Sequence, residues 1–154
     1  MNPLKCLNGL GLITLGILML NWTASAGADQ KASKTPHGSM EKCAKACADC
    51  MRECESCARH FAHEVAHGHK DHLRTLGTCA DCAEVCASAA KIVSRSGPFA
   101  KTICDSCARA CDQCGTACEK FSDDKHMARC ARACRECAKA CRDMVKHANH
   151  KDTE

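Results

Sequence analysis

The stretch CAKACADCMRECESC, residues 43–57, places five cysteines at alternating intervals of four and three residues. Such intervals follow one face of an α-helix, where leucine and isoleucine normally stand in a packed bundle. Three further runs repeat the pattern, so the sequence predicts helices whose buried faces carry thiols in place of aliphatic side chains. We call these residues the stripe cysteines: Cys43, Cys47, Cys50, Cys54, Cys57, Cys79, Cys82, Cys86, Cys104, Cys107, Cys111, Cys114, Cys118, Cys130, Cys134, Cys137 and Cys141.

Turn signals between the cysteine runs divide this region into four helices. The predicted helices cover about residues 40–67, 71–95, 98–121 and 124–147. Ser39 and the segment 122–124 are N-cap candidates, Gly68 stops the first helix, and residues 96–98 break the chain after the second. No segment shows the period-two alternation of a strand. The prediction is an all-α, antiparallel up-down-up-down four-helix bundle with a cysteine-lined core.

The N-terminal residues have the order of a secretory signal. A lysine at position 5 precedes the apolar run 10–20, and small residues follow at 24–26. The apolar run is short for a membrane span, although an uncleaved anchor stays an alternative. The expected organisation is a signal peptide over 1–26, a flexible leader over 27–38, a metal-binding bundle over 39–149 and a C-terminal tail over 150–154. An exported, periplasmic bacterial protein is therefore predicted.

Thiols in this number and spacing indicate soft metal ions. Cysteines four residues apart have Cβ atoms about 5–6 Å apart on one helix face, so two sulfurs can flank an ion of low coordination number. Soft thiolates select Cu(I), zinc and iron–sulfur clusters. One Cu(I) per thiolate leaves a neutral core, whereas zinc with four thiolates leaves two excess negative charges in each site. The charge balance favours multiple Cu(I) ions bound along the core.

Other interpretations of the cysteines stay open. The odd number of stripe cysteines and their continuous faces disfavour a disulfide framework. Iron–sulfur clusters usually use loop spacings, and a purely structural core rarely contains so many cysteines. A zinc or broad thiophilic-metal detoxification protein and a copper chaperone remain alternatives. A thiol oxidoreductase needs an exposed C-x-x-C pair of low pKa. No nucleophile–base arrangement stands out, so no enzyme is predicted.

The charge pattern argues against a nucleic-acid partner. The chain has a formal net charge of +4, only 3% aromatic residues, and basic side chains interleaved with acidic ones. A nucleic-acid groove requires concentrated Lys and Arg together with stacking rings. Copper ions are therefore the expected partners, with no nucleic acid and no stable membrane insertion.

The secretory-type N-terminus, the four cysteine-striped helices and the C-x-x-x-C pairs together resemble the bacterial copper storage proteins. The resemblance covers about residues 40–147. It implies a four-helix bundle that stores many Cu(I) ions in its lumen, with every stripe cysteine acting as a Cu(I) ligand. It also implies a homo-oligomer that exchanges copper with copper-requiring enzymes or copper chaperones.

Both ends of the stripes continue beyond the last cysteines. At one end the inward positions are Met40, Ala89, Val93, Ala100 and Met144. Because thioethers are soft ligands and His37 and His147 lie nearby in sequence, this end is predicted to be a metal entrance, with Met40, Met144, His37 and His147 as its ligands. The alternative is that both methionines only fill gaps in the core.

The opposite end carries larger rings and a histidine-rich segment. The inward positions there are Phe61, His72, Phe121 and Met127, with Leu73 and Leu76 beside them, and they predict a hydrophobic plug. His60, His63 and His67 share one helix face, which predicts an external site for a divalent metal ion. A solvated polar turn is the alternative for these histidines.

Overall fold

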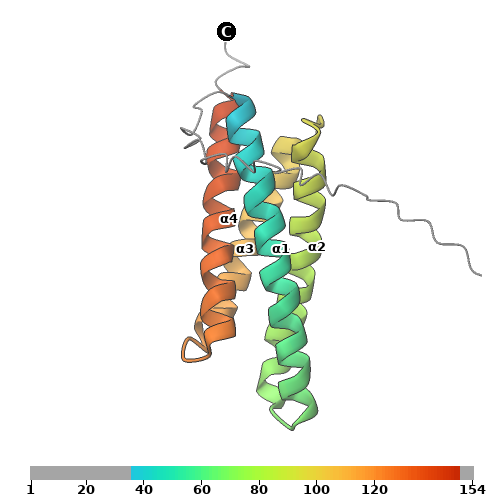
Figure 1. Cartoon of the computed structure of the whole chain (residues 1–154), viewed down its shortest axis with the longest axis vertical. Helices are drawn as coiled ribbons and strands as arrows, with labels where there is room; N and C mark the ends of the chain where they lie inside the picture. The colour runs from blue at the N-terminus through green and yellow to red at the C-terminus, as the bar shows by residue number, and fades with distance from the viewer. Residues whose placement is uncertain (1–35, 150–154) are drawn as a thin grey trace, which may run out of the picture. The chain divides into compact units, whose positions relative to one another are not determined.

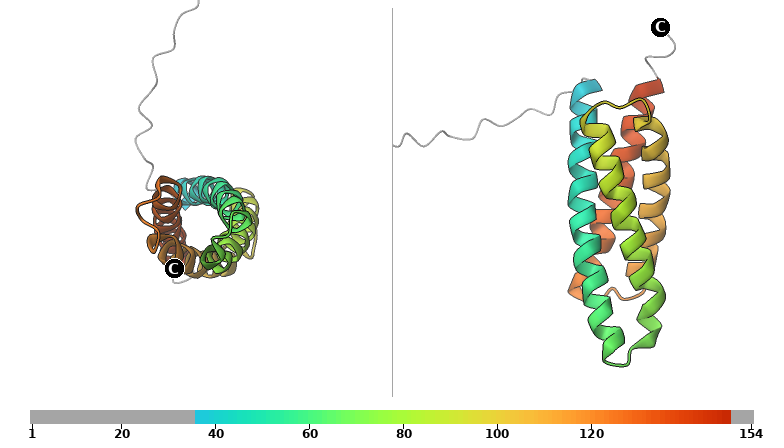
Figure 2. Two further views of the ribbon diagram at one scale, coloured as in Figure 1. Left: turned by 90° about the horizontal axis from the view of Figure 1, so that it is seen from below. Right: turned by 90° about the vertical axis from the view of Figure 1, so that its right-hand side faces the viewer.

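The computed structural model describes residues 36–149, which form the predicted four-helix bundle (Figure 1). The elements are α1 (Pro36–Ala66), the 3₁₀ turn η1 (Lys70–His72), α2 (Leu73–Ser94), α3 (Ala100–Glu119) and α4 (Lys125–Asn149). Each helix packs against its two neighbours in the cyclic order α1, α2, α3, α4. The view along the bundle shows the four helices around one core (Figure 2). The predicted fold class is confirmed, and the described residues contain no helix that is long and apolar enough to cross a membrane.

The first helix begins earlier than the sequence predicts. It starts at Pro36, so Ser39 lies inside α1 and not at its cap. Proline is favoured in a first helical turn because its missing N–H would be unpaired there and its fixed φ suits the helix. Residues 36–38 of the predicted leader are thus helical. The predicted signal peptide, the rest of the leader and the C-terminal tail lie outside the described residues and stay predictions.

Gly68 ends α1 as predicted. Its φ is +100°, which glycine adopts without steric cost. Its N–H donates to the Val65 carbonyl and the N–H of His69 donates to the Glu64 carbonyl, both at 3.1 Å. This crossed pair of hydrogen bonds satisfies the last carbonyls of the helix. The turn that follows extends beyond the α3–α4 turn (Figure 1), which places its histidines at one end of the bundle.

The second helix ends in the same way, but with serine in the left-handed position. Ser96 has a φ of +51°, and the N–H of Gly97 donates to the Ile92 carbonyl at 3.0 Å. The left-handed conformation costs a residue with a Cβ about 1–2 kcal/mol. Glycine avoids this cost, but its greater freedom in the unfolded chain offsets part of the gain. We therefore expect Ser96→Gly to raise the unfolding free energy of the metal-free chain by up to about 1 kcal/mol.

The matched control is the same substitution within the helix. Ser94→Gly should lower the unfolding free energy by about 0.5–1 kcal/mol, because glycine is a poor helix former. Urea unfolding of the reduced, metal-free variants measures both changes. A loss of stability in Ser96→Gly would contradict the assignment of strain to Ser96.

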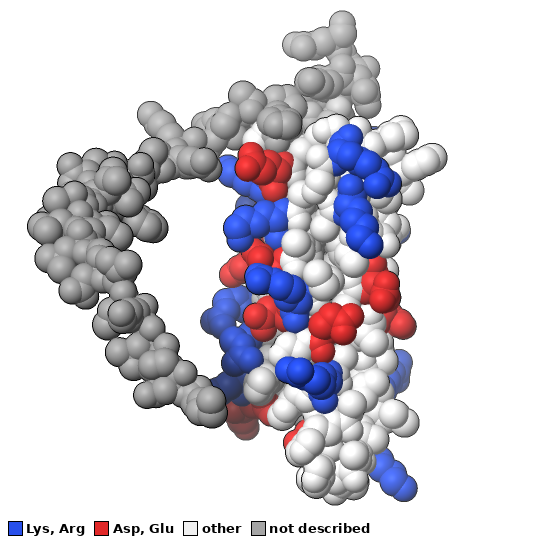
Figure 3. Space-filling view, turned by 45° about the vertical axis from the view of Figure 1, so that its right-hand side comes forward, with Lys and Arg blue, Asp and Glu red and all other residues white. Residues whose placement is uncertain are grey.

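A surface network joins α3 to α4. Arg135 donates two hydrogen bonds to the Glu119 carboxylate, at 2.9 and 2.8 Å, and one to the Asp112 carbonyl at 3.2 Å. Gly115 makes room for this arginine, since a Cβ there would lie 3.1 Å from the guanidinium carbon. Arg142 also donates to Asp112. Basic and acidic side chains interleave on the visible face (Figure 3). Because such pairs are exposed to solvent, each contributes little to stability.

Candidate metal centre

The core of the bundle consists mainly of thiols. All 17 stripe cysteines are at most 2% exposed, and all are free thiols. The other buried hydrophobic side chains are alanines and four larger residues, namely Phe61, Val93, Met127 and Met144. Each stripe therefore faces inward, as its helical period predicts. The core contains few large apolar side chains to stabilise it without metal.

The stripe sulfurs form one continuous network. Where α1 begins, the Sγ of Cys43 lies 3.5 Å from that of Cys104 and 3.7 Å from that of Cys141. Near the other end, the Sγ atoms of Cys118 and Cys79 are 3.6 Å apart. Successive Sγ–Sγ contacts of 4.0 Å or less connect all the stripe cysteines between these points. A disulfide requires about 2.05 Å, so these distances are those of separate thiols.

The thiols also form overlapping groups of ligand size. In one group of four, from Cys50, Cys82, Cys86 and Cys111, all Sγ atoms lie within 4.8 Å of one another. Four of the separations in this group are between 3.5 and 4.0 Å. Similar groups share Cys50, Cys54, Cys82, Cys130 and Cys134 with their neighbours. Because members are shared, an ion in one group would be bridged by thiolates to the next.

Hydrogen bonding among the buried thiols separates their pKa values. Hydrogen bonding with Cys114 lowers the pKa of Cys118 to about 5. Hydrogen bonding with Cys111 is the largest of several causes that raise the pKa of Cys134. The pKa is lowered for six stripe cysteines, at positions 43, 50, 82, 107, 118 and 130. It is raised for the other eleven.

These shifts predict that the metal-free chain loses stability in alkaline solution. Unfolded cysteines ionise near pH 8.5, whereas thiols with a raised pKa keep their protons in the folded chain. Above that pH the folded state binds more protons than the unfolded state, so each such thiol lowers the unfolding free energy by about 1.4 kcal/mol per pH unit. The six thiols of lowered pKa are then ionised in both states and do not oppose the loss.

Urea midpoints of the reduced, metal-free chain at pH 8, 9 and 10 measure this effect. The metal-loaded chain is the control, because its thiols are already deprotonated by coordination and its midpoint should change little. A midpoint of the metal-free chain that is constant or rises over this range would disprove the prediction.

The methionine end of the core, defined by Met40, Val93, Ala100 and Met144, lies where α1 and α3 begin. Met144 and Val93 are buried, and half-buried Met40 lines a groove of about 390 Å³ between α1 and α2. His147 is exposed, and the side chain of His37 lies outside the described residues. The structure therefore places both predicted methionines at one end of the thiol core.

The phenylalanine end is closed by packed rings. The rings of Phe61 and Phe121 meet edge to face with centroids 5.6 Å apart, and His72 lies 4.4 Å from Phe121. The predicted plug is present, although Leu73 is exposed and takes no part in it. The structure adds that the Cys57 thiol donates to the Sδ of Met127 at 3.2 Å. The spacing of Met127 from Cys130 signals this inward position, and its thioether extends the sulfur network.

The histidines of the predicted external site fall into two groups. The exposed rings of His63 and His67 lie 4.1 Å apart. His60 instead pairs with Asp124 of the α3–α4 turn at 2.8 Å and stacks on His126. Asp124 also caps α4 by accepting the His126 N–H at 2.7 Å. Burial acts to raise the pKa of Asp124, but the hydrogen bonds from His126 and His60 outweigh it and the pKa is lowered.

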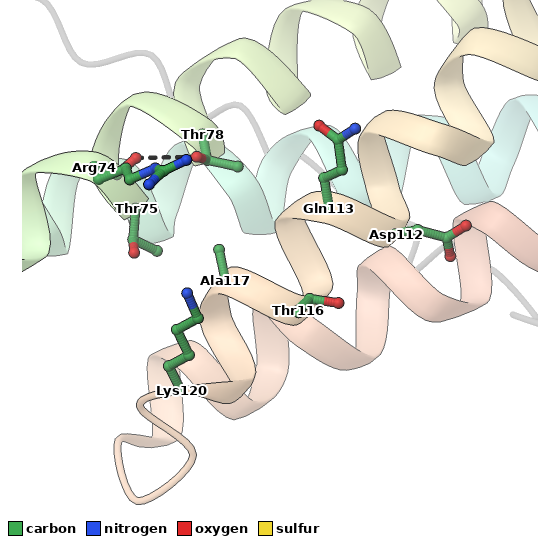
Figure 4. A pocket seen from close by; sticks show the side chains of 8 residues that line it. All are labelled: Arg74, Thr75, Thr78, Asp112, Gln113, Thr116, Ala117 and Lys120. Atoms are coloured by element: carbon green, nitrogen blue, oxygen red, sulfur yellow. Dashed lines mark hydrogen bonds between the residues drawn. The ribbon is translucent and has the colours of Figure 1, made fainter.

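A polar groove of about 480 Å³ lies on the outside of the bundle between α2 and α3 (Figure 4). Arg74, Lys120 and three threonines are among the residues that line it. None of the residues that line it is cysteine, histidine or methionine. The metal-ligating chemistry of the described residues therefore lies in the interior and at the bundle ends, and this groove does not contribute to it.

A comparison with known families identifies the bundle. The family model of the copper storage proteins, Csp, matches residues 36–146, which covers nearly all four helices. The chain belongs to the copper storage protein family. The resemblance predicted from the cysteine stripes is confirmed, and the role of this family is storage of copper.

Solved structures of copper storage proteins share the fold. The chain is 28% identical to a cytosolic copper storage protein from Streptomyces lividans loaded with five coppers, with a TM-score of 0.67. The match covers 72% of this chain and 95% of that one. It is 39% identical to the Cu(I)-bound copper storage protein BsCsp3, with a TM-score of 0.62, over 70% of this chain and 98% of that one. An uncharacterised cysteine-rich protein of Bacillus subtilis is 40% identical over 68 residues, which are 44% of this chain and 61% of that protein.

The predicted periplasmic location is wrong on this comparison, since the Streptomyces lividans relative is described as cytosolic. The prediction depended on a local pattern, an apolar run followed by small residues at the N-terminus. That pattern lies outside residues 36–146, the part of the chain that matches the family model. The bundle therefore gives no support to an exported location.

Proposed function

We propose that this chain stores Cu(I) along its whole lumen, with all 17 stripe cysteines as ligands and several ions per chain. The observation that carries the proposal is the continuous network of buried sulfurs, in which every stripe Sγ has another within 4.0 Å. Thiolates are soft ligands suited to Cu(I), and bridging lets one thiolate serve two ions. The metal-binding bundle then corresponds to residues 39–149. We infer no enzymatic activity, because the buried thiols serve as ligands.

We also propose that copper enters at the methionine end. Met144 follows Cys141 by three positions and Met40 precedes Cys43 by three, so both thioethers continue the stripes. His37 and His147 are the proposed outer ligands, which would receive an ion before the thioethers. Copper-requiring enzymes or copper chaperones are the proposed exchange partners, and a homo-oligomer is the proposed assembly.

The exposed histidines support a separate, weaker site. His63 and His67 lie ring to ring on the outside of α1 and can hold a divalent ion between them. His60 is the proposed third ligand, but it would first have to give up its hydrogen bond to Asp124. Isothermal titration with Ni(II) of His63→Ala and His60→Ala variants separates the two contributions.

Zinc or broad thiophilic-metal binding is the second candidate function. A zinc ion with four thiolates at 2.3 Å needs sulfur separations of about 3.8 Å. The group of Cys50, Cys82, Cys86 and Cys111 approaches this value, since four of its six separations are between 3.5 and 4.0 Å. Filling the core with zinc would nevertheless bury two excess charges in each four-thiolate site, which one Cu(I) per thiolate avoids.

A Cu(I) titration of the reduced chain against a competing chelator, with zinc run in parallel, tests the proposal. Storage predicts uptake of more than about ten Cu(I) per chain and little zinc, because the thiolates can bridge low-coordinate ions. Saturation at one to about four Cu(I) would instead support a chaperone. Zinc that competes equally with Cu(I) would support the detoxification alternative.

A further inference from the structure

The two ends of the thiol core differ in the number of helices that supply ligands. On α2 the stripe that carries Cys79, Cys82 and Cys86 continues as Ala89 and Val93. Both are fully buried and belong to the core. The other three helices still supply thiols near this end, through Cys43, Cys104 and Cys141. One of the four walls of the lumen is therefore hydrocarbon at the methionine end.

The antiparallel register places Val93 level with the last thiols. Cys57 and Cys79 share one four-thiol group, and Cys50 and Cys86 share another. From the first group to the second, the position on α1 decreases from 57 to 50 and the position on α2 increases from 79 to 86, because the two helices are antiparallel. A further change of seven residues on each helix places Cys43 level with Val93. The same relation holds between α2 and α3. Cys79 contacts Cys118 and Cys86 contacts Cys111, so a further change of seven residues places Val93 level with Cys104.

The missing thiol changes which ions the outermost position can hold. Zinc is almost always four-coordinate, and where it has three protein ligands a water molecule takes the fourth position. At this level the fourth side is the isopropyl group of Val93, which offers no ligand, and Val93 and the three thiols are all fully buried. Cu(I) needs only two or three soft ligands, which Cys43, Cys104 and Cys141 supply.

We propose that Val93 is a specificity-determining residue: by withholding a fourth thiolate it reserves Cys43 and Cys104 for Cu(I) and excludes divalent ions that require four ligands. The inference rests on the proposed Cu(I) storage function and assigns metal selectivity to one position of the lumen. Divalent ions retain the four-thiol groups deeper in the core, such as that of Cys50, Cys82, Cys86 and Cys111. A divalent ion in the group of Cys47, Cys107, Cys137 and Cys141 would take Cys141 and leave Cys43 and Cys104 as an unfilled pair.

Site-resolved alkylation of the reduced full-length chain tests this proposal, with Cd(II) as a thiophilic divalent probe that also takes four thiolates. The chain is saturated with Cd(II) or with Cu(I), exposed briefly to an alkylating reagent, and each cysteine is read by peptide mass spectrometry. In the unaltered chain we expect Cd(II) to slow alkylation of Cys50 and Cys86 by at least about tenfold and to leave Cys43 and Cys104 as reactive as without metal. Cu(I) should slow alkylation of all four.

Val93→Cys supplies the missing thiolate, and Cd(II) should then slow alkylation of Cys43 and Cys104 by at least about tenfold as well. Val93→Ser, which has nearly the size and shape of cysteine but no soft ligand, should show no such gain, and neither should Ser88→Cys, which adds a thiol on the exposed side of α2. Val93→His, which supplies an imidazole ligand at the same level, is the second variant if Val93→Cys does not fold.

Two results would overturn the selectivity proposal. One is protection of Cys43 and Cys104 by Cd(II) in the unaltered chain as strong as that of Cys50. The other is a folded Val93→Cys or Val93→His variant in which Cd(II) gives Cys43 and Cys104 no added protection. Failure of the storage proposal is distinct, because Cu(I) would then fail to protect the stripe cysteines in every variant.

Discussion

Loading the reduced chain with Cu(I) should raise its melting temperature by more than about 20 °C. Among residues 36–149 the core contains only four buried apolar side chains larger than cysteine, so the metal-free chain gains little from hydrophobic burial. An ion present at about a thousand times its dissociation constant adds about 4 kcal/mol, and the overlapping thiol groups offer several such sites. For a domain of this size, each kcal/mol corresponds to about 4 °C. Binding of Cu(I) to unfolded thiols reduces the gain but does not remove it.

Circular dichroism melting of matched metal-free and Cu(I)-loaded samples under reducing conditions measures this shift. Removal of the metal with an excess of a strong Cu(I) chelator is the control and should return the melting temperature to the metal-free value. A shift below about 5 °C would mean that the core is fully stable without metal and that copper binding is not coupled to folding.

Phe61→Ala should destabilise the metal-free chain by about 3–5 kcal/mol. Phe61 is completely buried, and its ring packs against His72 and Phe121 at the closed end of the lumen. Its removal leaves a cavity that neighbouring thiols are too small to fill. A loss of this size is large beside the total stability of a typical domain, so a substantial fraction of the metal-free variant should be unfolded.

Phe99→Ala is the matched control, since Phe99 is 68% exposed and its loss should change stability by less than about 0.5 kcal/mol. Urea unfolding measures both variants in the metal-free state. The copper capacity of Phe61→Ala should be unchanged once the variant is loaded, because its ring supplies no ligand. Equal small effects from both substitutions would show that the phenylalanine end carries little of the stability.

The sequence predicts the thiol core well because the core depends on one strong periodicity. The alternating intervals from Cys43 to Cys57 fix which face of α1 is inward, and Gly68 marks its end through a conformation that glycine adopts easily. Helix starts are less certain, since Pro36 and Ser39 are both acceptable near an N-terminus and tertiary context decides between them. Ser96 takes the left-handed position next to a glycine that was the better candidate on propensity alone.

The spacing of residues along one helix does not predict contacts between residues that are far apart in the sequence. The pairing of His60 with Asp124 joins residues 64 positions apart. It separates His60 from His63 and His67, although the sequence predicts all three on one helix face. The sulfur contact of Cys57 with Met127 joins residues 70 positions apart, although the inward position of Met127 follows from its own helix. The N-terminal signal pattern shows the opposite problem, since it is local and carries no information about the bundle.

The unbroken sulfur network has a consequence for how fast a stored ion can move. An ion beside Cys118 can reach Cys43 by steps of ligand exchange in which a new Cu–S bond forms before the old one breaks, because each next sulfur is within 4.0 Å. No step passes through a free ion in a buried, apolar space, which would be costly. Depth in the lumen then adds little to the barrier for release. The rate at which the chain empties should depend on the last exchange at the proposed entrance, the methionine end, whichever ion is released.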